Sequence, residues 1–230
     1  MERVLQVLDY AVLIISAADG VTGQVRTLWR LLEHYGVPVF VFVNKMDQSG
    51  ADRAAVYAQI RDELGTACVD LQESFAAAGP ASSGHLSGKD SAGAAEYTGL
   101  QAEPVFSSAL QEEIAVCDET LMERFFDGEE IVSADAAKLV AARKLFPVCF
   151  GSALREEGVD DLLAMLDVLA PQPVRGDVFG ARIYKITHEG GSTTGGASLT
   201  WMKITGGVLL PRQQIPESPD EKGQPEKAAQ

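Results

Sequence analysis

The sequence has little of what would assign a protein to the secreted, metal-binding or membrane classes. Its 230 residues include three cysteines, Cys68, Cys117 and Cys149, which are too few and too scattered for a disulfide framework. Their spacing fits no zinc pattern, so they are expected to be small core residues in a reduced cytosol. No apolar run approaches the ~20 residues of a membrane helix, and the N-terminal residues lack the design of a signal peptide. These absences predict a cytoplasmic protein with no membrane partner.

Basic residues are also scarce. The chain has 19 Lys and Arg against 33 Asp and Glu, which gives a formal net charge of −14 and a sequence pI of about 4.6. This balance argues against a large basic surface, and direct DNA binding is not expected, although a local basic patch is not excluded. Hydrophobic residues make up 46% of the chain, so it can bury a core, and its length suits one large domain or two small ones.

The most informative segment is Val39–Asp47, with the sequence VFVFVNKMD. A short apolar run of β-branched and aromatic residues, stopped by polar residues, predicts a strand buried on both faces of a parallel α/β sheet. Ligands of open α/β sheets bind outside the carboxyl ends of the strands. Asn44, Lys45 and Asp47 would stand at such an end, where Asn-Lys-x-Asp resembles the guanine-recognition motif of GTP-binding proteins.

Hydrophobic patterns divide the rest of the chain into alternating strands and helices. The predicted buried strands are Ala11–Ser16, Val39–Val43 and Phe146–Phe150, and the predicted helices are Thr22–Tyr35, Asp52–Leu64, Ala109–Phe126, Ser133–Leu145 and Val159–Ala170. Asp52 is the expected N-cap of its helix. Strands joined by helical crossovers pair in parallel, so the expected fold class is an α/β sheet with flanking helices.

Changes in composition set the expected domain boundaries. Residues 1–173 are expected to form one α/β domain with a flexible insertion at about 66–108, where a long stretch is rich in Ala, Gly and Ser. Pro171-Gln172-Pro173 marks its end. Residues 174–215 alternate in hydrophobicity and predict the first strands of a β module that is too short for an independent barrel. Residues 216–230 lack apolar periodicity and are expected to be a disordered tail.

The polar end of the central strand has the chemistry to recognise guanine. Guanine carries N1–H and N2–H2 donors side by side, and the single carboxylate of Asp47 can accept from both. Adenine offers no such pair of donors, and leaving a buried carboxylate unpaired is costly, so discrimination can be strong. Lys45 would lay its aliphatic stem along the face of the base, and Asn44 would brace the loop by hydrogen bonds.

A second loop must hold the other side of the base. Ser152 and Ala153 follow the later strand that ends at Phe150, and they suit this task. The Ser152 hydroxyl can orient Asp47, and the Ala153 backbone N–H can donate to guanine O6. Taken alone, Asn-Lys-x-Asp is also consistent with a helix cap or a solvated loop. A Ser-Ala pair directly after another buried strand favours the guanine site.

The segment AVLIISAADGVTGQVRTLWRLLEHYGVPVFVFVNKMD resembles the core of translational GTPases of the elongation factor G class, and within that class the tetracycline ribosomal protection proteins. FPVCFGSAL and the β segment beginning VFGARIYKI extend the similarity. The resemblance implies a P-loop-GTPase-type sheet followed by the start of a β-barrel domain. It also implies a guanine-binding set made of Asn44, Lys45, Asp47, Ser152 and Ala153, with Leu154 contributing its backbone only.

The same resemblance implies GTP or GDP with Mg²⁺ as cofactors and the ribosome as partner, with release of tetracycline in the protection subgroup. The phosphate-binding motif G-x-x-x-x-G-K-[ST] is absent from the 230 residues, so an incomplete sheet is expected, with the Mg²⁺ ligands outside this chain. The chain alone is therefore expected not to hydrolyse GTP. The alternative is a non-catalytic α/β protein-interaction module. A flavodoxin-like enzyme is a weaker third hypothesis, because the sequence contains no phosphate-loop signature for such an enzyme.

Overall fold

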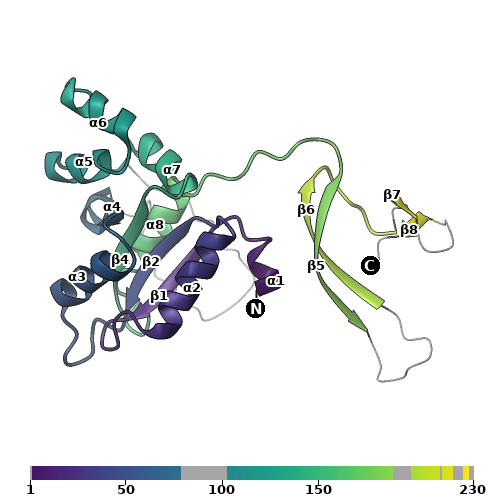
Figure 1. Cartoon of the computed structure of the whole chain (residues 1–230), viewed down its shortest axis with the longest axis horizontal. Coiled ribbons are helices and arrows are strands. Elements are labelled where there is room, and N and C mark those ends of the chain that lie inside the picture. Colours follow the sequence, from purple (N-terminus) through teal and green to yellow (C-terminus); the bar gives the residue numbers. More distant parts are fainter. Residues whose placement is uncertain (1, 79–102, 189–197, 213, 220–224, 228–230) are drawn as a thin grey trace, which may run out of the picture. The chain divides into compact units, whose positions relative to one another are not determined.

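The chain forms two compact units, each of which is described by itself. The structure is a computed structural model that describes residues 2–78, 103–188, 198–212, 214–219 and 225–227 (Figure 1). One unit comprises Asp9–Pro171, and the other comprises Met1–Leu8 with Gln172–Gln230. Most of the Ala-, Gly- and Ser-rich stretch of the predicted insertion lies outside the described residues.

The larger unit is built on one four-stranded sheet. In chain order its elements are β1 (Ala11–Ser16), α2 (Gly23–His34), β2 (Val39–Asn44), α3 (Arg53–Glu63), β3 (Cys68–Asp70), α4 (Gln72–Ala78), α5 (Ser108–Ala115), α6 (Glu119–Phe126), α7 (Ser133–Ala141), β4 (Phe146–Phe150) and α8 (Val159–Leu169). The strand order is β1-β2-β4-β3, and every pairing is parallel. The predicted α/β fold with a parallel sheet and flanking helices is confirmed.

β2 lies inside the sheet, and its side chains alternate between two helical layers. On one face, α2 and α3 contribute the buried side chains of Val25, Trp29 and Ile60. The Trp29 ring packs edge-on against Phe146 of β4, with 4.7 Å between the ring centroids. Figure 1 shows α2 lying across β1 and β2. This layer explains the apolar stripe that predicts the helix after β1.

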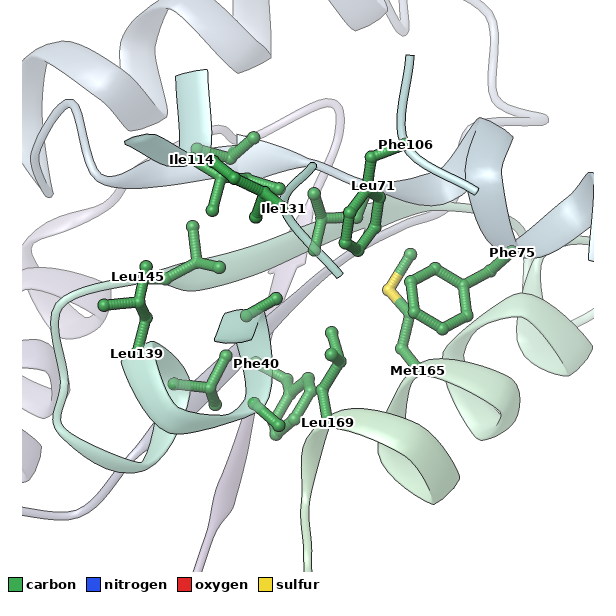
Figure 2. Close-up of a cluster of buried hydrophobic side chains, with 14 of the residues drawn as sticks. Phe40, Leu71, Phe75, Phe106, Ile114, Ile131, Leu139, Leu145, Met165 and Leu169 are labelled. Carbon is green, nitrogen blue, oxygen red and sulfur yellow. The ribbon is translucent and has the colours of Figure 1, made fainter. Parts of the chain in front are cut away.

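The opposite face of the sheet carries the largest buried cluster. Phe40 and Phe42 of β2 pack there with buried residues of α4, α7 and α8. Figure 2 shows Met165 of α8 beside Phe75 of α4, and Leu169 of α8 beside Phe40 of β2. Burial of these side chains, at roughly 25 cal/mol per Å² of apolar surface, is the main force that holds the sheet and its loops in place.

β1 forms an edge of the sheet, and one of its faces is not covered. Leu13 and Ile15 are buried, whereas Val12 is 38% exposed and Ile14 is 60% exposed. Ile14 is in register with Phe42, so the exposed side chains of β1 lie on the same face of the sheet as the buried cluster. They continue that face to the β1 edge, where the other described side chains leave them exposed. The expectation of a fully buried strand therefore holds for one face only.

The start of the predicted flexible insertion is an ordered part of the core. Residues 66–78 include β3 and α4, and the side chains of Leu71 and Phe75 are buried. β3 pairs with β4 and extends the sheet by one strand. A strand of three residues is too short to show an alternating pattern, which is why composition assigns it to the insertion.

The predicted helix Ala109–Phe126 is two helices, α5 and α6. The Asp118 side chain accepts hydrogen bonds from the backbone N–H groups of Thr120 and Leu121 and caps the start of α6. The apolar positions stay in phase across the break, so periodicity alone predicts one continuous helix. The N-cap aspartate is the sequence signal that marks the second start.

The smaller unit contains a β hairpin. β5 (Gly180–His188) pairs antiparallel with β6 (Ser198–Gly206), with a register shift between Ile183 and Lys185. α1 (Glu2–Leu5) belongs to the same unit, in which the Arg182 guanidinium donates to the Gln6 carbonyl at 2.7 Å. The antiparallel pair confirms the predicted β segment.

A second strand pair follows where the sequence predicts a disordered tail. β7 (Gln214–Pro219) pairs antiparallel with β8 (Pro225–Lys227). Backbone hydrogen bonds hold such a pair and require no apolar alternation, so the absence of a hydrophobic pattern does not predict the absence of strands.

Candidate functional site

Two loops follow the carboxyl ends of neighbouring strands and lie next to each other. β2 ends at Asn44 and β4 ends at Phe150, and these strands are paired in parallel. The loop after β2 carries Lys45 and Asp47, and the loop after β4 carries the other residues that the sequence predicts. The topology therefore brings the two predicted halves of the site together across more than 100 residues of sequence.

Asn44 joins the two loops. Its side-chain oxygen Oδ1 accepts hydrogen bonds from the backbone N–H of Lys45 at 2.8 Å and from the backbone N–H of Ala153 at 2.9 Å. Because both partners are donors, the atom between them must be the amide oxygen, which fixes the orientation of the side chain. The sequence predicts that Asn44 braces its own loop. In the structure its side chain also forms a hydrogen bond with the second loop.

The backbone reinforces this connection. The N–H of Gly151 donates to the carbonyl of Val43 at 2.9 Å, and the N–H of Met46 donates to the carbonyl of Gly151 at 3.1 Å. Lys45, which precedes Met46, has φ of +66°, a left-handed conformation that is uncommon for residues other than glycine. The Asn44 bond to its N–H helps hold Lys45 in that conformation.

Asp47 and Ser152 face each other across the loops. The Ser152 hydroxyl is the largest cause that holds the pKa of Asp47 below its ordinary value of 3.8, so this carboxyl is ionised at neutral pH. Ser152 is 1% exposed, and its hydroxyl oxygen has no hydrogen-bond partner among the described residues. The buried Ser152 hydroxyl thus has unused hydrogen-bonding capacity near the Asp47 carboxylate.

Arg155 is the charged neighbour of Asp47. Its Nε lies 3.7 Å from Asp47 Oδ2, and the two side chains are 59% and 14% exposed. The positive charge is a smaller cause that lowers the pKa of Asp47. The sequence analysis does not predict this contact. The one indication in the sequence is that Arg155 directly follows Ser152-Ala153-Leu154.

The second loop has a tight shape that two glycines permit. Ser152 and Glu157 exchange backbone hydrogen bonds of 2.9 and 3.1 Å and close the loop. A Cβ on Gly151 would lie 2.1 Å from the Glu157 carbonyl oxygen, and one on Gly158 would lie 2.2 Å from the Phe150 carbonyl oxygen. Gly158 also has φ of +73°. Larger residues at either position would push Ser152 away from Asp47.

Gln72 of α4 supports the second loop, although it belongs to neither of the two loops that the sequence predicts as the site. Its side-chain amide accepts from the Phe150 N–H at 3.1 Å and donates to the Phe150 carbonyl at 2.9 Å, and it also donates to Asp161 at 2.8 Å. The Gln72 amide therefore forms the two backbone hydrogen bonds that a neighbouring strand would form with Phe150, the last residue of β4. No local pattern points to Gln72, because its partner lies 78 residues away in sequence.

The outer side of the site is open. Lys45 and Ala153 are exposed, and Leu154 is 88% exposed. A separate cavity of about 440 Å³ is lined by residues of α3, α4 and α5 with parts of the adjoining segments, including Tyr57, and shares no residue with the two loops. Among the described residues, no three His, Cys, Asp or Glu side chains are grouped so that they could hold a metal ion. In the same ranges, no helix is long and apolar enough to cross a membrane.

Comparison with protein families decides the class. A family model described as the elongation factor Tu GTP binding domain matches residues 1–172. The chain belongs to this family. The family membership confirms the resemblance to translational GTPases, and it does not favour the alternative of a non-catalytic interaction module.

Comparisons with individual proteins extend the match. The chain is 32% identical over 231 residues to the oxytetracycline resistance protein of Streptomyces rimosus. This covers 94% of the chain and 31% of that relative, so the chain spans about a third of its length. A protein of Thermus thermophilus with a known crystal structure has the same fold, with a TM-score of 0.64 and 21% identity over 99% of this chain and 36% of that one.

Proposed function

We propose that the chain recognises the guanine base of GTP or GDP at the two joined loops. The proposed guanine-binding residues are Asn44, Lys45, Asp47, Ser152, Ala153 and Leu154. Membership of a GTP-binding family supports guanine nucleotide as the ligand. The observation that carries the assignment to these residues is the Asn44–Ala153 hydrogen bond, which holds both loops together beside an ionised carboxylate.

Each residue has a role that its surroundings suit. Asp47 accepts from N1–H and N2–H2 of guanine, and the proposed role of the Ser152 hydroxyl, which is buried and has no hydrogen-bond partner among the described residues, is to donate to Asp47 when the base is bound. The Lys45 stem lies along one face of the base, and its exposed side chain is free to do so. Ala153 and Leu154 line the site with their backbone. Contacts to phosphate and to Mg²⁺ are assigned to none of these residues.

Substitution of Asp47 by Asn tests the assignment. An amide can no longer accept two donors but can donate to the second oxygen of xanthine, so base preference should move from guanine towards xanthine. Competition between guanosine and xanthosine nucleotides measures this preference. Asp52→Asn is the matched control, because Asn at the N-cap of α3 keeps the same capping bond. If the Asp47→Asn chain kept its preference for guanine, Asp47 would not be the residue that recognises the base.

We also propose that the longer protein represented by such relatives acts on the ribosome in the cytoplasm, with GTP and Mg²⁺. The oxytetracycline resistance relative makes tetracycline protection the leading ribosomal role. This chain alone is expected not to turn GTP over, because the phosphate-binding motif is absent from its sequence. Co-sedimentation of the chain with ribosomes, with and without GTP, tests the first proposal. Phosphate release by the purified chain would contradict the second.

A further inference from the structure

The cavity of about 440 Å³ is lined by residues of α3, α4 and α5 with the segments that adjoin them, and none of these residues belongs to the two loops. Its volume is within the range of pockets that hold small ligands. The lining includes the carboxylates of Asp70, Glu73 and Glu113, and it includes no Lys, Arg or His side chain from the described residues. The cavity is therefore expected to repel anions and to attract cations.

Glu73 supplies the part of this charge that no arginine balances. Arg53 Nη2 lies 2.5 Å from Asp70 Oδ2. Arg61 Nη1 lies 3.4 Å from Glu113 Oε1. Within the described ranges, Glu73 of α4 forms no ion pair. An exposed carboxylate of this kind is common on protein surfaces and does not define a site by itself.

The Ser74 hydroxyl is an independent indication of a ligand. Ser74 follows Glu73 on α4, lines the cavity and is only 8% exposed. Its hydroxyl forms no hydrogen bond with any residue that the structure describes. Buried hydroxyls are nearly always hydrogen-bonded, because an unpaired one has lost its bonds to water without replacement. A group that occupies the cavity would supply the missing partner.

Other residues of the lining suit an alkyl chain. Tyr57 donates its hydroxyl proton to the Cys68 carbonyl at 3.3 Å and accepts from the Asp70 N–H at 3.2 Å, so its polar end is already used. Its ring and the side chains of Val105 and Leu110 give the lining an apolar part. A ligand that combines a positive charge with methylene groups would use both kinds of surface.

We propose that the cavity binds a linear alkylammonium cation, such as a small aliphatic diamine. One ammonium group donates to the Glu73 carboxylate and to the Ser74 hydroxyl oxygen, and the methylene chain packs on Leu110 and the Tyr57 ring. An ammonium group carries three donors and no acceptor, so it suits a lining whose unused polar atoms can accept. This site does not depend on the proposed guanine site, and the two should bind their ligands independently.

Titration of the 230-residue chain with cadaverine, followed by NMR at about 150 mM salt, tests the proposal. Cadaverine should shift the backbone amide signals of Ser74 and Leu110 in a saturable way. The pentane diol of the same length has no charge and should bind about tenfold more weakly. Glu73→Gln and Ser74→Ala should each weaken cadaverine binding about fivefold, as expected for loss of an exposed ion pair or of one hydrogen bond.

Glu112→Gln is the matched control. It removes the same charge from an exposed residue of α5 that does not line the cavity, and it should leave the affinity for cadaverine unchanged. Equal weakening by Glu112→Gln and Glu73→Gln would show a general attraction of cations to an acidic chain and would overturn the site. Absence of saturable binding, or binding that Ser74→Ala does not weaken, would overturn it as well. Guanosine binding should be the same in all three variants, so failure of this site is distinguishable from failure of the proposed function.

Discussion

The side-chain oxygen of Asn44 lies 2.9 Å from the backbone nitrogen of Ala153, and this hydrogen bond joins two loops that are 109 residues apart in sequence. The same oxygen accepts from the Lys45 N–H. A single side chain therefore satisfies one donor in each half of the site, and the consequences of changing it should appear in both.

Asn44→Ala should loosen both loops while the sheet stays folded. It leaves the N–H groups of Lys45 and Ala153, which are on exposed residues, to bond with water, at a cost of about 0.5–1.5 kcal/mol in the free energy of unfolding. Hydrogen exchange should become faster at these two amides and stay unchanged in β1. Asn44→Asp keeps an acceptor at this position and should retain slow exchange. Equal exchange rates in the original and the Ala variant would show that the bond does not hold the loops.

Gln72→Leu should destabilise the second loop from a distance. The leucine has similar size but leaves the N–H and the carbonyl of Phe150 unpaired, so the chain should lose about 2 kcal/mol or more of stability. Chemical denaturation measures the loss, and exchange at the Phe150 amide locates it. Gln24→Leu, on the exposed side of α2, is the control and should have little effect. An equal loss in both variants would show that the support by Gln72 is not specific.

The stability of the chain should fall in acid, partly through Asp118. The Lys144 ammonium and the Thr120 hydroxyl hold the pKa of Asp118 well below its ordinary value of 3.8. A carboxyl with a depressed folded-state pKa stabilises the fold above its unfolded-state pKa, and this contribution is lost as the pH falls below it. Thermal unfolding of Asp118→Asn should therefore depend less on pH below about 4.

Lys144→Met provides the matching test from the other partner. It removes the same ion pair and should flatten the acid dependence in the same pH range as Asp118→Asn. The double variant should add nothing further, because the two substitutions interrupt one interaction. Full additivity would mean that the carboxylate is stabilised by other groups.

Ile14→Lys should reduce self-association of the chain. Ile14 is 60% exposed at the uncovered end of the sheet, on an edge strand that can pair with another chain. A charged side chain there opposes such pairing, and sedimentation velocity at high protein concentration measures it. Val116→Lys changes an apolar residue that is 64% exposed outside the sheet and should not alter association. The same decrease in both variants would indicate a general solubility effect.

The sheet and the two loops could be predicted from the sequence because strong local patterns carry them. The β2 and β4 segments are unbroken apolar runs, and the polar residues after them stand at strand ends in any parallel arrangement. Asp52 was predictable as an N-cap, and its carboxylate accepts from Ala54 and Ala55. These features depend on neighbouring residues alone.

The contacts that complete the site could not be predicted, because they depend on distances between remote residues. Gln72 lies on a short helix after a strand of three residues, and neither element shows a pattern by itself. The use of the Ala153 N–H by Asn44 depends on how closely β2 and β4 approach at their last residues. Arg155 is close to Asp47 only because the second loop turns back on itself at Glu157.

The backbone bonds from Gly151 to Val43 and from Met46 to Gly151 carry the sheet's hydrogen-bonding pattern past the ends of the strands. The two loops cannot separate without breaking part of the sheet, so the site is preformed and does not have to close around its ligand. Encounter rates should then be similar for all purine nucleosides. Selectivity between bases should appear in how long each one stays bound, since a rigid site distinguishes ligands mainly by their rates of dissociation.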